Sequence, residues 1–206
     1  MTRRLRMFPL HTVLFPHGVL PLHVFEPRYL AMISEALADD ATFGVVLIER
    51  GSDVGGRDSR FTVGCEAKIV RAGRLGEGRL AVVALGVERF RVKEWLADDP
   101  YPIALVSAQP DPEPYPALGG DMEDARRKYR RLMAFASELG ADVGTRDLDL
   151  PEDPGAALWN LCSVAPIEQL DRQLLLEIDD PRERVARLCI ALDEQSDSIH
   201  ARLSGG

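Results

Sequence analysis

The segment from Phe8 to Ile33 contains three closely spaced prolines, which restrict the structures that it can form. Each of Pro9, Pro16 and Pro21 fixes its φ angle and lacks a backbone N–H. None of them can therefore occupy the middle of a central β-strand. The segment is expected to run as short extended pieces broken by turns, with Gly18 supplying a turn.

A short helix is predicted to follow these extended pieces. Proline suits the first helical position, so the pair Glu26-Pro27 indicates a helix start. Tyr29, Ile33 and Ala36 then repeat at helical spacing. The first part of the chain thus predicts a β, β, short-helix order.

Further β-strands are predicted as far as about Gln109, because apolar residues alternate or form short runs. The loop Gly76-Glu77-Gly78 separates two of these stretches and indicates a hairpin. The predicted strands cover residues 43–48, 61–71, 79–85, 88–93 and 103–107. Such a series of short strands favours a small antiparallel barrel or pseudo-barrel.

The chain changes character at residues 110–120, where alternating prolines predict a stiff, extended linker. Beyond it the apolar period lengthens from two to about 3.6, which predicts helices over residues 121–206. Asp153-Pro154 and Asp180-Pro181 indicate helix starts, and another helix is expected to begin at Pro166. The predicted inward positions are Met122, Ala125, Tyr129, Leu132, Ala136, Leu139, Leu158, Leu161, Ile167, Leu170, Leu174, Ile178, Val185, Leu188 and Leu192.

Four ordered pieces of the chain resemble one known family. The stretch FPLHTVLFPHGVLPLHVFEPRY resembles the opening of the Lon N-terminal domain, in the form found in small stand-alone bacterial proteins. The other pieces are Val63-Gly64 with Ala67 and Ile69, Gly86 with Arg89 and Phe90, and Gln173 to Leu175 with Glu177 followed by residues 179–188. The resemblance extends from about Leu5 to Leu192.

The resemblance implies an α+β fold: an N-terminal PUA-like β pseudo-barrel followed by a C-terminal α-helical bundle. The predicted subdomains are a β-rich part at 1–109, a Pro-rich linker at 110–120 and a helical part at 121–206. In full Lon proteases this region helps to recognise substrates and to assemble the ring, and an ATPase and a Ser-Lys protease domain follow it. Neither of those domains follows here before Gly206, so only the recognition part is expected.

The resemblance therefore predicts a non-catalytic, ATP-independent protein/peptide-binding module. Its expected ligand is unfolded or degron-bearing polypeptide, or a protein partner. The expected site is an apolar groove where the barrel meets the helices, lined by Phe25, Tyr29, Phe90 and Trp159, each of which could equally belong to the core.

Two alternatives remain open besides this one. PUA-like barrels in other proteins read RNA, but the net charge of −8 disfavours a nucleic-acid partner. The basic cluster 126–131 is expected to be a solvated helix face whose side chains pair with Glu123 and Asp124. A small-molecule sensor is the second alternative, because cereblon also carries a Lon-type domain; its ligand pocket lies in a zinc-bearing domain whose cysteines are missing here.

The motifs that would indicate an enzyme are missing from the sequence. There is no G-x-S-x-G elbow and no P-loop, so no catalytic residue and no cofactor are expected. His11, His17 and His23 fit no common zinc spacing, so no metal site is expected. The three scattered cysteines indicate buried, reduced thiols and a cytoplasmic protein, and no apolar run is long enough to span a membrane.

Overall fold

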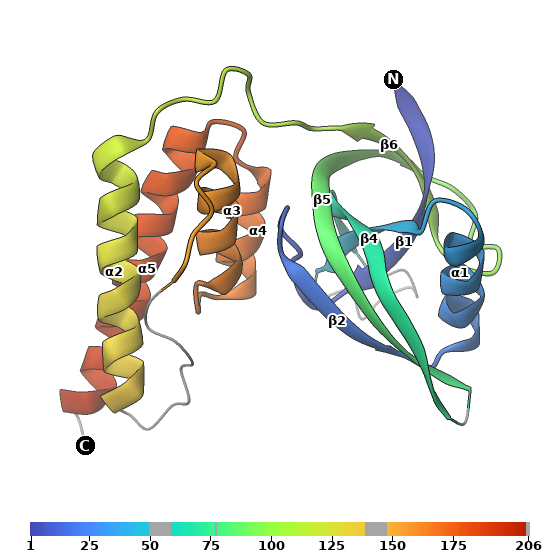
Figure 1. Cartoon of the computed structure of the whole chain (residues 1–206), viewed down its shortest axis with the longest axis horizontal. Helices are drawn as coiled ribbons and strands as arrows, with labels where there is room; N and C mark the ends of the chain where they lie inside the picture. Colours follow the sequence, from blue (N-terminus) through green and yellow to red (C-terminus); the bar gives the residue numbers. More distant parts are fainter. Residues whose placement is uncertain (50–58, 77, 139–147, 205–206) are drawn as a thin grey trace. The chain divides into compact units, whose positions relative to one another are not determined.

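The computed structural model describes residues 1–49, 59–76, 78–138 and 148–204, and the side chains as far as Ala201. It divides into two compact units, a barrel unit at Met1–Pro110 and a helical unit at Asp111–Gly206. The barrel unit holds β1 (Thr2–Leu10), β2 (Val19–Val24), α1 (Pro27–Ala38), β3 (Thr42–Ile48), β4 (Arg60–Gly76), β5 (Arg79–Trp95) and β6 (Ile103–Ala108); the helical unit holds α2 (Gly119–Glu138), α3 (Pro154–Val164), α4 (Gln169–Glu177) and α5 (Pro181–Ser204). The predicted α+β class, with strands first and helices after, is confirmed (Figure 1).

The strands of the barrel unit close into a barrel. The sheet order is β2-β5-β4-β3-β1-β6, and β6 also pairs with β5. The ring therefore runs β1–β3–β4–β5–β6 and back to β1, while β2 adds to the free half of β5. The stretches 79–85 and 88–93, expected as two strands, are one continuous strand, β5.

One strand pair differs from the antiparallel barrel that the sequence suggested. β1 and β3 are parallel, with Met7 opposite Gly44 and Leu10 opposite Leu47. Parallel neighbours need a long crossover connection rather than a tight hairpin. Here β2 and α1 provide that connection, because they lie between β1 and β3 in the chain.

The three prolines of the first segment lie where the sheet can accept them. Pro9 pairs with Val46 of β3, in a part of β1 beyond Arg6, where the pairing with β6 has ended. Pro21 lies in β2, which has β5 as its only strand neighbour within the described sheet. Pro16 lies in the turn that leads into β2.

That turn differs in one detail from the expectation. The N–H of Gly18 donates to the carbonyl of Phe15 at 3.0 Å, and His17, with a φ of 61°, adopts the left-handed conformation in place of Gly18. The turn packs against Gly86 of β5, where an added Cβ would lie 2.0 Å from the carbonyl oxygen of Phe15. Only glycine allows this approach, so Gly86 fixes where β2 begins.

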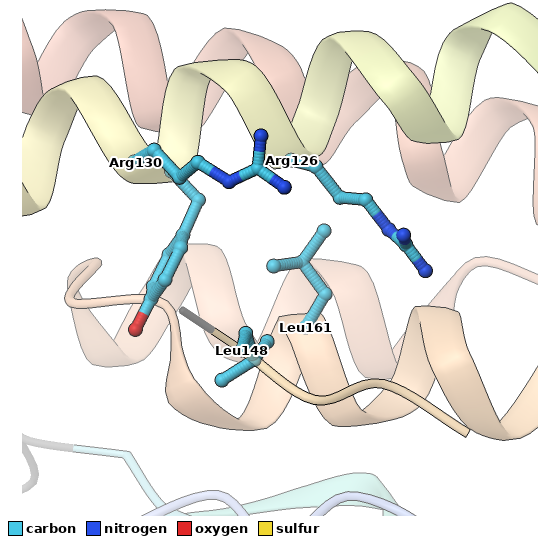
Figure 2. A pocket seen from close by; sticks show the side chains of 5 residues that line it. Arg126, Arg130, Leu148 and Leu161 are labelled. Atoms are coloured by element: carbon cyan, nitrogen blue, oxygen red, sulfur yellow. The ribbon is translucent and has the colours of Figure 1, made fainter. Parts of the chain in front are cut away.

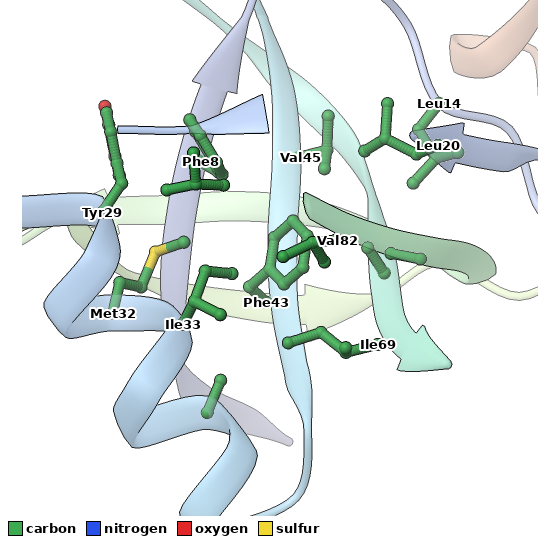
Figure 3. Packing of buried hydrophobic residues seen from close by; sticks show 14 of the residues in the cluster. Phe8, Leu14, Leu20, Tyr29, Met32, Ile33, Phe43, Val45, Ile69 and Val82 are labelled. Atoms are coloured by element: carbon green, nitrogen blue, oxygen red, sulfur yellow. The ribbon is translucent and has the colours of Figure 1, made fainter. Parts of the chain in front are cut away.

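Two buried clusters of described residues lie in the barrel unit. The larger one packs α1 against the strands, with Tyr29, Met32, Ile33 and Ala36 facing Phe43 and its neighbours (Figure 3). The smaller one, at the β1–β5–β6 part of the ring, contains Leu5, Met7, Val46, Phe90, Val92, Ala104 and Val106. The predicted helix start at Pro27 and the inward stripe that follows it are both confirmed.

The helical unit is organised around α2 and α5, which run side by side in the same direction (Figure 1). Lys128 pairs with Asp193, and further along both helices Phe135 lies 6.0 Å from His200. The predicted cap of α3 is confirmed, since Asp153 Oδ1 accepts a hydrogen bond of 2.7 Å from the N–H of Ala156. Leu158 and Leu161 are fully buried, as predicted.

The fourth helix differs from its expected start and orientation. α4 begins at Gln169 rather than Pro166 and buries Gln173, Leu175 and Leu176. Leu170 and Leu174, expected to face inward, are 63% and 47% exposed. The buried side of α4 thus carries a polar residue, Gln173, whose Nε2 donates to Glu177 Oε1 at 2.8 Å.

Candidate functional site

The outer face of β2 and β5 exposes a strip of aliphatic side chains. Val19 lies opposite Leu85, and Pro21 lies opposite Val83. Residues directly opposite each other in an antiparallel pair point to the same face, and Val87 follows Leu85 on that face. Val19, Leu85 and Val87 are 62%, 38% and 49% exposed. These five residues are called the β2–β5 outer face below.

Basic side chains border this face on the next strand. Lys68 of β4 lies opposite Leu85, and Arg71 lies opposite Val83. Both are exposed. The outer face is therefore apolar along β2 and β5 and positively charged along β4.

The free edge of β2 offers an interrupted row of backbone groups. The N–H of Gly86 donates to the carbonyl of Gly18 at 2.8 Å, so the even-numbered residues that follow direct their backbone groups toward β5. The backbone groups of Val19, Pro21 and His23 face the other way. Because Pro21 has no N–H, the middle of this edge lacks a donor.

Of the four residues predicted to line a binding groove, Phe25 and Tyr29 lie in contrasting environments. Phe25 follows the last residue of β2 and is 67% exposed. Tyr29 is buried: its ring stacks on Phe8 with centroids 4.1 Å apart, and the guanidinium of Arg28 lies 4.6 Å from its centroid. Burial raises the pKa of the Tyr29 hydroxyl.

The other two predicted residues are also core residues of their units. Phe90 is 1% exposed and fills the space over Gly44 and Gly64, where an added Cβ would lie within 3 Å of its ring. Trp159 belongs to the helical unit and is 2% exposed. Its Nε1 donates to Asp111 Oδ2 at 2.6 Å, and Arg184 Cζ lies 3.7 Å from its ring centroid. A groove combining all four would join both units, which are described separately, so it stays a prediction.

The outer face itself was not predicted from the sequence. Valine and leucine in a strand are normally expected in the core, so their apolar character did not indicate an exposed surface. A signal was nevertheless available, because Val19, Pro21, His23 and Phe25 occupy alternate positions and a proline within a strand favours an edge strand.

The barrel unit also holds a polar pocket of about 310 Å³ beside the end of α1. Arg6 lies in it, with Nη2 2.9 Å from Asp39 Oδ2 and Nη1 3.5 Å from Asp40 Oδ1. The hydrogen bond to Asp39 raises the pKa of Arg6. Tyr101 donates to Glu35 and is held neutral by burial, which raises its pKa. Arg4 lines the pocket as well, so two basic side chains stand against the two carboxylates and the pocket offers little to attract a charged ligand.

The expected ion pairs on α2 are present in altered form. Asp124 pairs with Arg127 and lies 3.8 Å from Lys128, which also pairs with Asp193. The expected pairing of Glu123 with Arg127 does not occur among the described contacts. Within the basic cluster 126–131, these ion pairs among the described residues involve Arg127 and Lys128.

The three cysteines are free. Burial raises the pKa of Cys162 to about 12 and that of Cys189 to about 11, and the pKa of Cys65 rises further. The described residues contain no group of three or more metal-ligating side chains. None of the helices that the structure describes has the length and apolar character needed to cross a membrane. The glycine-rich stretch 51–58 lies outside the described residues.

The fold places the chain among α+β proteins in which a β barrel precedes a helical bundle. A family model described as the ATP-dependent protease La (LON) substrate-binding domain matches residues 4–194. The chain therefore belongs to the LON substrate-binding domain family, and the resemblance found in the sequence is confirmed.

Curated relatives and solved structures agree with this family. The chain is 31% identical to Lon protease 2 of Herpetosiphon aurantiacus over 202 residues, covering 96% of this chain and 24% of the relative. It is 37% identical to the Lon protease of Anaeromyxobacter dehalogenans over 175 residues, covering 84% and 19%. The chain thus spans about a quarter or less of the length of these relatives.

Among solved structures, the Lon N-terminal domain protein from Xanthomonas campestris superimposes with a TM-score of 0.63 at 26% identity. That match covers 90% of this chain and 96% of the other. The N-terminal domain of the Mycobacterium avium complex Lon protease gives 0.62 at 21% identity, covering 93% and 98%, and supports the fold.

Proposed function

We propose that this chain is a non-catalytic polypeptide-binding module that holds an extended, unfolded or degron-bearing segment against the β2–β5 outer face. The observation that carries the proposal is the exposure of Val19, Leu85 and Val87 side by side on a folded sheet. Contiguous exposed apolar side chains on a soluble fold mark interaction sites. Phe25 extends the same row beyond the end of β2.

The chemistry of this surface suits an unfolded chain better than a folded partner. Unfolded polypeptide carries apolar side chains that folded proteins bury, and aliphatic side chains bind them without directional demands. Fully burying one Val or Leu is worth about 1.5–3 kcal/mol, but association entropy offsets much of this gain. The expected affinity is therefore weak, on the order of micromolar.

The family supports the same function. Its description names a substrate-binding domain, and the curated relatives are Lon proteases. The ATPase and peptidase activities of those longer proteins are not proposed for this chain, which corresponds to about a quarter of their length. We also propose a reducing, cytoplasmic location, because three free thiols are compatible with it.

The experiment measures binding of fluorescein-labelled casein, a largely unfolded polypeptide, by fluorescence anisotropy. The test variant V19D/L85D places two carboxylates in the outer face, and we expect its affinity to fall at least roughly tenfold. The control L37D places one carboxylate at an exposed apolar position of α1, away from this face. Binding that is equally weak for both variants, or unchanged in V19D/L85D, would contradict the proposed surface.

The same assay addresses the RNA alternative. A labelled single-stranded RNA should bind with an affinity that falls steeply with salt if phosphate contacts dominate. We expect no such binding. Salt-sensitive RNA binding stronger than casein binding would favour the alternative.

A further inference from the structure

Two arginines of α2 stand apart from the rest of their basic cluster. Arg127 and Lys128 pair with acidic side chains, and Arg131 lies over the ring of Phe135, with 5.3 Å from Cζ to the centroid. Arg126 and Arg130 form no ion pair or hydrogen bond with the described residues.

These two arginines line the same small cavity. Its volume is about 10 Å³, and Tyr129, Leu148 and Leu161 complete its lining. Figure 2 shows both side chains leaving α2 on the side that faces Leu148 and Leu161. A space of this size admits one water or one ligand oxygen, not a whole small molecule.

Among the described residues, the arrangement of these two arginines carries an electrostatic cost. Arg126 and Arg130 are one helical turn apart, where like charges repel. The Nε of Arg126 is buried without an acceptor, and a buried donor without a partner is unfavourable. Leu148 and Leu161 exclude water from one side, which strengthens any hydrogen bond formed there. An oxyanion bound between the guanidinium groups would relieve both costs.

We propose that Arg126 and Arg130 form a binding site for a carboxylate of a polypeptide ligand, supplied by an acidic side chain or by a C-terminus. Planar guanidinium groups match the geometry of a carboxylate and can bind it through paired hydrogen bonds. The inference rests on the proposed function in that the ligand is a polypeptide, but it concerns the helical unit and not the β2–β5 outer face.

Charge distribution favours a single carboxylate over a polyphosphate chain. Residues 111–206 contain 20 acidic and 11 basic side chains, a net charge of −9. A long polyanion such as RNA would meet this negative field over its whole length, whereas one carboxylate responds mainly to the charges within about 10 Å.

The test uses labelled Gly-Ser peptides and fluorescence anisotropy. One peptide carries central glutamates and an amidated C-terminus, a second carries glutamines and a free C-terminus, and a third carries glutamines and an amide. The first two separate the two sources of the carboxylate, and the third should not bind. Inorganic phosphate serves as a competitor.

Two double variants provide a matched comparison. R126Q/R130Q and R127Q/R131Q each remove two positive charges, at the same spacing, from the same helix. We expect R126Q/R130Q to weaken binding of at least one carboxylate peptide roughly tenfold or more, and R127Q/R131Q to retain binding within about threefold. If circular dichroism shows that R126Q/R130Q does not fold, R126K/R130K replaces it. Lysine keeps the positive charge but lacks the planar guanidinium that binds a carboxylate through two hydrogen bonds, so this variant should still bind more weakly than the wild type.

Several outcomes would overturn the inference. Equal losses in both double variants would indicate a general charge effect. Failure of both carboxylate peptides to bind, or displacement by inorganic phosphate at concentrations below those of the peptide, would show that the cavity does not select carboxylates. Casein binding measured on the same variants keeps the two proposals separate: if casein binds and the carboxylate peptides do not, this inference fails and the proposed function stands.

Discussion

The guanidinium of Arg184 lies over the indole ring of Trp159, with 3.7 Å between Arg184 Cζ and the ring centroid. The same guanidinium donates to Asp111 Oδ1 at 2.9 Å and to the carbonyl of Ile178 at 2.7 Å. Asp111 also accepts from Trp159. One buried cation thus joins the start of the helical unit to α3, α5 and the end of α4.

Replacing Arg184 with methionine should destabilise the helical unit by about 3 kcal/mol, because a buried charge pair that loses one partner leaves the other uncompensated. Arg184 is fully buried, so solvent cannot replace it. The measurement is urea unfolding followed by Trp159 fluorescence in a Trp95→Phe background. Arg182→Met, an exposed position on the same helix, should change the midpoint little; equal effects would contradict the role of the Arg184 contacts.

Replacing Gly86 with alanine should destabilise the barrel unit by about 1–3 kcal/mol, since the added methyl group overlaps the Phe15 carbonyl and must displace the turn. We also expect weaker casein binding, because that turn positions β2. Gly73→Ala in β4 is the matched control, as no atom lies within 4 Å of the added Cβ. The measurement is thermal unfolding of both variants. A Gly86→Ala protein as stable as Gly73→Ala would contradict the close approach of Gly86 to the Phe15 carbonyl.

Protein stability should fall as the pH rises above about 9. Burial holds the thiols of Cys162 and Cys189 protonated up to about pH 12 and 11, and the Tyr115 hydroxyl up to about pH 12. The unfolded chain releases these protons at lower pH, so it binds fewer protons than the folded state and is favoured by alkali. These three groups contribute their full stabilisation of the folded state only at pH values below the pKa that each group has in the unfolded chain.

The alkaline effect can be measured by urea unfolding between about pH 8 and about pH 11. The decline should be shallower in Cys162→Ala, because one raised pKa has been removed. Thiol alkylation at mildly alkaline pH should likewise be slow in the native protein and fast after denaturation. Rapid native alkylation of all three cysteines would contradict the burial of Cys65 and Cys162.

Replacing Phe25 with alanine should weaken casein binding several-fold while leaving stability within about 0.5 kcal/mol, because the ring is mostly exposed. Replacing Phe90 with alanine should instead cost about 3–5 kcal/mol, because it leaves a cavity over Gly44 and Gly64. Anisotropy and thermal unfolding together distinguish a surface residue from a core residue. A Phe25→Ala protein with unchanged binding would remove Phe25 from the proposed surface.

Local signals in the sequence predicted local structure well. The start of α1 at Pro27 and the cap of α3 at Asp153 follow from residues adjacent in the chain, whose preferences barely depend on the rest of the fold. The parallel β1–β3 pair and the continuous β5 depend on contacts between distant segments, and periodicity does not encode them.

The candidate site was harder to predict for a related reason. The sequence leaves open whether Phe90 and Trp159 line a groove or belong to the core, because large aromatic rings gain much from burial in either place. The outer face uses Val19 and Leu85, whose exposure depends on which side of the barrel each strand presents. The pairing of Lys128 with Asp193 depends on the position of α5, and the absence of an ion pair between Arg126 or Arg130 and any described residue depends on side-chain directions that helical spacing alone does not give.

The missing donor at Pro21 has a consequence for how a guest chain is held and let go. A strand edge with all its backbone donors and acceptors could form a continuous hydrogen-bonded ladder with any extended segment, including the edge strand of another copy. Repeated pairing of that kind between copies leads to aggregates. For the proposed polypeptide ligand, the interrupted edge leaves apolar side-chain contacts as the main source of retention, and such contacts tolerate many sequences and registers. We therefore expect the proposed capture to be promiscuous and short-lived, so that a bound segment is readily released.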